Sequence, residues 1–192
     1  MYDIYHETAF ENLESILKYQ TLFKSSELNS RGRSGQGSVN RRLAQDPTIS
    51  LVNRTFYDSY DEVDAVYFRL KTHKSPIELV YNEVLLLFSG SLLDDHDSVI
   101  NTEENFGFMI RENGKEGESQ FSGNMGISIF NKERIDILYN LDFDHKRSEI
   151  AVLDNVCLKY LKAIYMKTKY RLLAERKVVG MCKQLDIPII YL

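Results

Sequence analysis

The stretch Ile4-Tyr5-His6-Glu7-Thr8, together with the segment from Ala9 to Tyr19, is the part of the chain from which its fold follows. The first has the pattern of a short strand with a polar edge. The second carries apolar residues at helical spacing, namely Phe10, Leu13, Ile16 and Leu17. His6 and Thr8 lie two residues apart on the predicted strand, so both side chains leave the same face, just before a helix N-terminus. Thr8 is also expected to cap this helix, with Glu11 as its partner in a capping box.

This opening resembles that of the ADP-ribosyltransferases, in which a Tyr-His-x-Thr strand and an Asn-Leu-x-x-Ile-Leu helix begin the NAD pocket. The matching residues are Tyr5, His6, Thr8, Asn12, Leu13, Ile16 and Leu17. The DarT-type group, toxins that modify DNA bases, and the RNA 2′-phosphotransferases open in a similar way. The resemblance implies that His6 and Thr8 bind the ribose hydroxyls of NAD and that Asn12 belongs to the same site. The alternative is a buried histidine beside an ordinary helix.

Composition predicts one globular domain spanning residues 1–192, with 43% hydrophobic and 27% charged residues. No apolar run approaches the roughly 20 residues that a membrane span requires, and no signal peptide is visible, so an intracellular protein is expected. Cys157 and Cys182 are expected to be buried free thiols. The cysteines lack metal-ligand spacing and the four histidines are far apart in sequence, so no metal site is expected.

Charge is unevenly distributed along a chain whose net charge is −4. Four arginines crowd the glycine- and serine-rich stretch from Ser30 to Arg42, which is predicted to be a loop: Arg31, Arg33, Arg41 and Arg42. Such a run is usually a solvated surface, but it also suits a nucleic acid or a pyrophosphate.

Strands are also predicted for residues 48–52, 65–70, 83–88 and 188–192, and the nearly continuous apolar run of residues 83–88 indicates a central strand. Residues 94–105 are expected to form an acidic loop, and residues 167–182 a helix. The strand at residues 48–52 leads to Arg54, as in the second NAD-contacting element of the ADP-ribosyltransferases. The resemblance implies that Arg54 balances the pyrophosphate charge. Tyr57 is a candidate to stack on nicotinamide, or it fills the core.

Glu149 opens an apolar strand near the other end of the chain, in a block that resembles the carboxy-terminal signature of the same transferases. A carboxylate there would stabilise the electron-poor ribose as nicotinamide leaves and accept the proton of the incoming nucleophile. The resemblance therefore implies that Glu149 is the catalytic residue. The alternative is an exposed carboxylate at a strand end.

The acceptor is suggested by what precedes Glu149. Arginine-modifying members of the superfamily carry Glu-x-Glu or Gln-x-Glu, whereas this chain has Arg147-Ser148-Glu149. A cation at residue 147 would repel a guanidinium acceptor and attract a phosphate backbone, which favours a base of DNA or RNA. A protein acceptor, an antitoxin partner and an inactive binding module remain alternatives. The expected fold is α+β, with split mixed or antiparallel sheets that form an NAD cleft flanked by helices.

Overall fold

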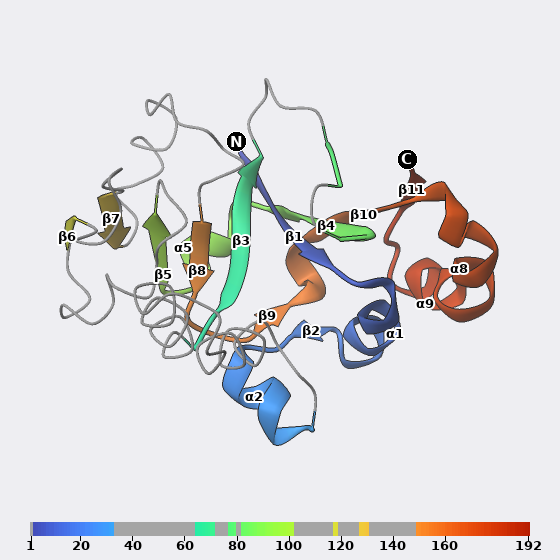
Figure 1. Cartoon of the computed structure of the whole chain (residues 1–192), viewed down its shortest axis with the longest axis horizontal. Helices are drawn as coiled ribbons and strands as arrows, with labels where there is room; N and C mark the ends of the chain where they lie inside the picture. Colours follow the sequence, from blue (N-terminus) through green and yellow to red (C-terminus); the bar gives the residue numbers. More distant parts are fainter. Residues whose placement is uncertain are drawn as a thin grey trace, which may run out of the picture.

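The computed structural model describes residues 2–32, 64–71, 77–79, 82–101, 117–118, 127–130 and 149–192. Its elements (Figure 1) are, in chain order, β1 (Asp3–Thr8), α1 (Phe10–Tyr19), β2 (Thr21–Leu22), α2 (Ser25–Ser30), β3 (Val66–Lys71), β4 (Val84–Ser89), α5 (Leu92–Asp95), β5 (Ser98–Asn101), β6 (Gly117–Glu118), β7 (Ile127–Phe130), β8 (Glu149–Val152), β9 (Val156–Cys157), the 3₁₀ turn η1 (Leu158–Tyr160), β10 (Leu161–Met166), the 3₁₀ turn η2 (Thr168–Tyr170), α8 (Arg171–Lys177), α9 (Val179–Gln184) and β11 (Ile189–Tyr191).

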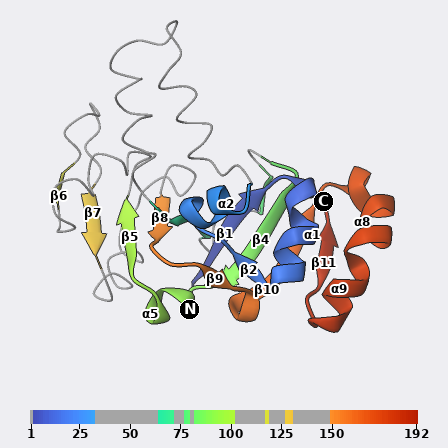
Figure 2. The same ribbon diagram turned by 90° about the horizontal axis from the view of Figure 1, so that it is seen from below.

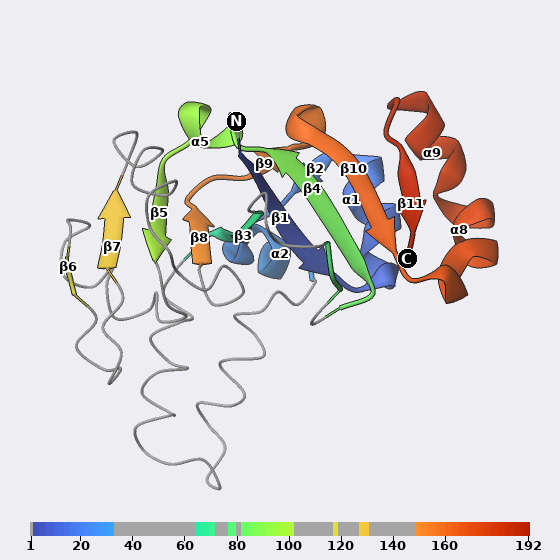
Figure 3. The same ribbon diagram turned by 90° about the horizontal axis from the view of Figure 1, so that it is seen from above.

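The strands form one mixed sheet, and helices cover one of its faces. The order in the sheet is β11-β10-β4-β1-β3-β8-β5-β7-β6, and β2 pairs separately with β9. Among the described strands only β10 and β11 are parallel. Figures 2 and 3, which view the molecule from opposite sides, place α1 and α2 on the same face of the sheet, and α8 and α9 beyond β11. The predicted α+β class with a mixed sheet is confirmed.

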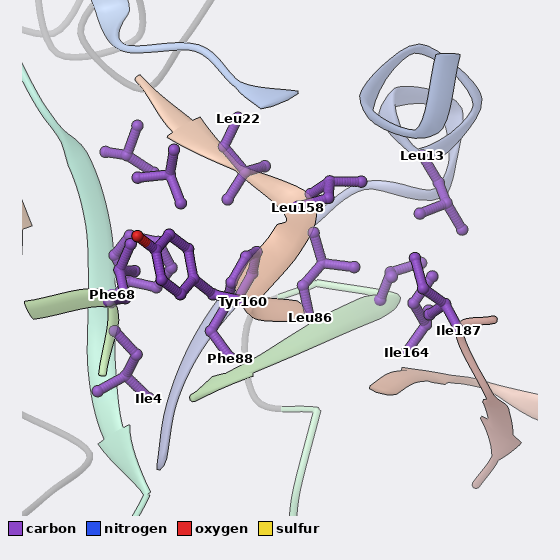
Figure 4. Close-up of a cluster of buried hydrophobic side chains, with 14 of the residues drawn as sticks. Ile4, Leu13, Leu22, Phe68, Leu86, Phe88, Leu158, Tyr160, Ile164 and Ile187 are labelled. Carbon is purple, nitrogen blue, oxygen red and sulfur yellow. The ribbon is translucent and has the colours of Figure 1, made fainter. Parts of the chain in front are cut away.

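β4 is an interior strand of the sheet, as the apolar run predicts. It pairs with β1 on one side and with β10 on the other. Leu86 and Phe88 pack toward the helices, in the core that Figure 4 shows, and Leu85 and Leu87 pack against the opposite face. Both faces of β4 are therefore buried, which explains why its sequence does not alternate. From α1 the predicted residues Phe10, Leu13 and Leu17 enter the core.

The sheet divides along β3, because this strand changes its partner. Residues 66–68 pair with β8, whereas residues 69–71 pair with the first half of β1, where the last paired residue is Tyr5. β1 keeps β4 as its partner as far as Thr8. Within the described part of the chain, β1 has no ladder partner on the β3 side from His6 onward. The two halves of the sheet therefore separate beside His6, in keeping with the predicted split arrangement.

Several local predictions need correction. The acidic stretch contains β5, because pairing with β7 and β8 imposes a strand there. The predicted helix of residues 167–182 is divided into η2, α8 and α9, with a break at Val178 (φ −124°, ψ −25°). Cys182 is buried, and burial raises the pKa of its thiol to about 11, but Cys157 is exposed. The predicted loop of residues 30–42 lies outside the described residues from residue 33 onward, and Ser30 ends the helix α2.

Candidate functional site: a polar pocket at the division of the sheet

A pocket of about 120 Å³ lies where β1 and β3 separate. His6 and Thr8 of β1 both line it, so the prediction that they share one face of the strand is confirmed. The rest of the lining comes from α1 (Asn12, Ser15 and Ile16), from the segment after it (Thr21, Leu22, Phe23, Ser25 and Leu28) and from the start of β3 (Ala65, Val66 and Tyr67). The lining therefore combines polar and apolar side chains, as ligand pockets commonly do.

The main chain of β3 fixes the tautomer of His6. Its Nδ1 lies 2.7 Å from the carbonyl oxygen of Tyr67. Because a carbonyl only accepts, Nδ1 carries the hydrogen and donates it. Burial lowers the pKa of His6 and outweighs the Tyr67 hydrogen bond, which acts in the opposite direction. The ring is therefore neutral near pH 7 and Nε2 is a hydrogen-bond acceptor. Nothing else in the described residues bonds to the imidazole, so Nε2 is available to a hydroxyl donor.

Thr8 and Asn12 are joined across the start of α1. The Asn12 amide donates to the Thr8 hydroxyl over 3.2 Å, and Thr8 is only 7% exposed. The predicted capping box is wrong, because Ala9 is the N-cap residue and makes no side-chain cap bond. The bond from Asn12 occupies an acceptor site of the Thr8 oxygen, so the Thr8 hydroxyl retains a hydrogen to donate. Thr8 and Asn12, like His6, are thus brought together as the sequence predicted.

A carboxylate at the start of β3 holds the outer wall of the pocket. Asp64 accepts hydrogen bonds from the Ser26 amide (2.8 Å) and the Ser26 hydroxyl (2.7 Å), and it pairs with the Lys24 ammonium at 2.9 Å. Partial burial raises the pKa of Asp64, but the bonds from Ser26 and Lys24 outweigh it and lower the pKa overall. The Lys24 amide also donates to the Asn155 side chain over 3.0 Å. Lys24 and Ser26, on either side of Ser25, are therefore both anchored, to Asn155 and Asp64 respectively.

The backbone of Glu149 lies near the same division. Ile150 of β8 pairs with Phe68 of β3, and Glu149 is the next residue outward. Its partner on the other side is Asn101 of β5. The register places the Glu149 backbone two strands from β1, or roughly 10 Å at the usual spacing of strands in a sheet. Arg54, Tyr57 and the strand predicted for residues 48–52 lie outside the described residues.

Sequence reasoning missed several pocket residues. Ser15 follows Asn12 by three positions, so helical spacing predicts that both lie on one face of α1. Thr21, Leu22, Phe23 and Ser25 lie between the end of α1 and the first residue of α2, where no single period marks the residues that line the pocket. The carbonyl of Tyr67 had no sequence signal, because main-chain groups are the same at every residue.

The described part of the chain has neither the features of a metal site nor those of a membrane-spanning helix. No group of three or more His, Cys, Asp or Glu residues there is arranged to hold a metal ion. None of the helices found there has both the length and the apolar character to cross a membrane.

The fold is that of the DarT-type ADP-ribosyltransferases. The structure of DarT from Thermus sp. 2.9 in complex with ADP-ribosylated ssDNA superposes with a TM-score of 0.55 at 15% identity, over 99% of this chain and 93% of that chain. The complex of the same enzyme with NAD+ gives a TM-score of 0.54 at 16% identity, over 98% and 94% of the two chains. At such identities the likeness establishes the fold, and the resemblance inferred from the sequence is confirmed at that level.

The chain belongs to a family of unknown function, DUF5863, whose model matches residues 1–168. A relative with a similar sequence is uncharacterized protein 422L of Invertebrate iridescent virus 6. It is 38% identical over 175 residues, which cover 87% of this chain and 86% of the relative.

Proposed function

We propose that this protein is an NAD-dependent mono-ADP-ribosyltransferase, with residues 1–192 as one catalytic domain, and that it transfers ADP-ribose to a base of DNA or RNA and releases nicotinamide. The observation that carries the proposal is the neutral His6, whose acceptor Nε2 lies with the Thr8 hydroxyl in a pocket at the division of a DarT-like sheet. This pair offers one acceptor and one donor, the combination that a ribose diol requires.

Each predicted site residue has a role in this proposal. His6, Thr8 and Asn12 bind and orient the ribose, and the Arg54 guanidinium balances the pyrophosphate charge. Tyr57 stacks on the nicotinamide ring. The Glu149 carboxylate stabilises positive charge on the ribose as the bond to nicotinamide breaks, with the bonding electron pair leaving on nicotinamide. It then accepts the proton that the acceptor base loses as the new bond to the anomeric carbon forms.

Two observations favour a nucleic-acid acceptor. Arg147 stands two residues before Glu149, where a cation suits a phosphate backbone. The solved DarT complex contains ADP-ribosylated ssDNA, and this chain shares its fold. A protein acceptor is the second candidate within the same chemistry, and an antitoxin partner stays a prediction from the sequence alone.

The decisive experiment follows label from NAD carrying a radioactive adenylate phosphate. Single-stranded DNA, duplex DNA, RNA and a cell lysate are offered to wild type, Glu149→Gln and a control, Glu175→Gln, which changes an exposed carboxylate on α8. We expect label on nucleic acid, a rate lowered by roughly 10²–10³-fold in Glu149→Gln, and no change in the control. Label on lysate proteins alone would favour the second candidate. Absence of both label and nicotinamide release would leave a binding module.

A further inference from the structure

A cluster of two aromatic rings and two cations lies on the outer surface beside the pocket. It consists of Lys18 and Tyr19 at the end of α1, Phe23 in the following segment, and Arg31 just after α2. Only Phe23 also lines the pocket. The cluster therefore begins at the rim of the pocket and extends away from it.

The rings and the guanidinium are stacked on one another. The Arg31 guanidinium carbon lies 4.1 Å from the centre of the Phe23 ring and 5.2 Å from that of the Tyr19 ring. The two rings meet edge to face, with 5.7 Å between their centres. The Lys18 ammonium lies 6.0 Å from the Tyr19 ring. Such contacts hold aromatic and guanidinium planes in defined orientations.

The position of Arg31 is fixed by the end of α2. Its Nε and Nη2 atoms bond to the same Glu27 oxygen at 2.9 and 2.8 Å. Its backbone amide donates to the Glu27 and Leu28 carbonyls, and Gly32 follows at φ +68°, the left-handed conformation that ends a helix. A pre-ordered side chain loses less entropy when a ligand stacks on it.

The cluster nevertheless remains accessible. Tyr19 is 46% exposed, although large aromatic residues are usually buried. The Arg31 side chain is 38% exposed. An open ring and a planar guanidinium, with a lysine beside them, form the combination that binds single-stranded nucleic acid, because bases stack on the planes and cations contact the phosphates.

We infer that Lys18, Tyr19, Phe23 and Arg31 form the docking surface for a single-stranded nucleic-acid acceptor, which holds bases next to the one that enters the site. The inference rests on the proposed function for the class of acceptor. A duplex binds this surface less well, because its bases are already stacked on each other. The adenine of NAD offers a similar ring, but Tyr19, Lys18 and Arg31 lie outside the pocket lining.

The test measures binding of a short fluorescein-labelled single-stranded DNA by fluorescence anisotropy, without NAD. Tyr19→Ala and Arg31→Lys are each expected to raise the Kd about tenfold, from the usual energy of stacking one base. Tyr19→Phe retains the ring and should bind like wild type. In Lys18→Ala the slope of log K against log salt, which is negative, should become less steep by about 0.7, the value for one phosphate contact to a single strand.

Arg171→Lys is the matched control. Arg171 also pairs with a glutamate four residues away, Glu175 at 3.5 Å, and lies 5.6 Å from an aromatic ring, that of Tyr191, but it is on α8. Unchanged binding in this control, with unchanged NAD affinity in Tyr19→Ala, supports the inference. Three outcomes would each overturn it. The first is a wild type that does not bind the DNA, and the second is a loss of DNA affinity in Arg171→Lys as large as that in Arg31→Lys. The third is weaker NAD binding with intact DNA binding in Tyr19→Ala. Failure of the proposed function would appear separately, as absence of nicotinamide release from a protein that still binds DNA.

Discussion

Replacing His6 by either of two amides separates the two functions that we assign to its ring. Asparagine places a nitrogen donor near the position of Nδ1, so His6→Asn retains the bond to the Tyr67 carbonyl and loses the acceptor in the pocket. Glutamine places its amide near the position of Nε2, so His6→Gln retains a polar group in the pocket and loses the bond from the ring to the Tyr67 carbonyl. Both variants lose the contact with the Phe68 ring, whose centre lies 5.8 Å from that of the imidazole. The difference between them therefore reports on the hydrogen bonds.

The expected magnitudes follow from the 2.7 Å bond and the partial burial of the ring. Losing a single hydrogen bond of this kind costs about 0.5–1.5 kcal/mol of unfolding free energy. A difference of about 1 kcal/mol lowers the Tm by roughly 2–4 °C in a protein of this size. His6→Gln should thus unfold at a lower temperature than His6→Asn. In contrast, NAD affinity should fall by between about two- and tenfold in His6→Asn, for one lost hydrogen bond, and less in His6→Gln.

Thermal unfolding by circular dichroism and NAD titration by calorimetry measure the two effects on the same preparations. Thr21→Val removes a pocket hydroxyl that donates to the Tyr19 carbonyl over 3.1 Å, and it controls for the loss of one hydrogen bond in the pocket that does not involve the imidazole. Equal Tm values for the two His6 variants would refute the assigned tautomer. Wild-type NAD affinity in His6→Asn would refute the role of Nε2.

Three further outcomes are expected. Burial lowers the pKa of His6, so the imidazole of the unfolded chain is protonated at a higher pH than that of the folded protein, from about pH 6.5 downward. The free energy of unfolding of the wild type should therefore decrease between pH 7.5 and 5. In urea titrations, His6→Asn should show a smaller decrease over the same range. Asp64→Ala should lower the free energy of unfolding by about 1 kcal/mol, the usual loss for a capping side chain. Hydrogen exchange at the Ser26 amide should become faster, whereas exchange at a core amide of β4 should not change. Gly90→Ala should destabilise by about 1–3 kcal/mol in urea, since a Cβ there would lie 2.6 Å from the Tyr2 carbonyl oxygen, whereas at Gly180 it meets nothing within 4 Å and should be neutral or stabilising.

Local pattern predicted the elements that carry the site. Alternation on β1 placed His6 and Thr8 on one face, and helical spacing directed Leu13 and Leu17 into the core. The apolar run of β4 indicated a strand buried on both faces. These predictions were correct because they depend on periodicities that the backbone imposes on each residue and its near neighbours.

Local pattern failed where a contact that it did not predict competed with the predicted one. Thr8 has the composition of a helix cap, but its oxygen accepts from the Asn12 side chain instead. The acidic stretch after α5 contains a strand because β7 and β8 provide ladder partners on both sides. In the first case a side-chain bond from four residues along the chain outweighed the predicted cap, and in the second case pairing with distant strands outweighed a local preference of similar, small energy.

The amino-acid pattern alone predicts which side chains face together on β1 and α1, because those positions follow from the periods of a strand and a helix. Strand pairing, in contrast, sets where β3 leaves β1, which tautomer of His6 the Tyr67 carbonyl selects, and how Asp64 holds the start of α2. The two hydrogen bonds join residues that are 61 and 38 positions apart. Their geometry depends on how strands pair across the sheet, and no local repeat in the chain encodes that pairing.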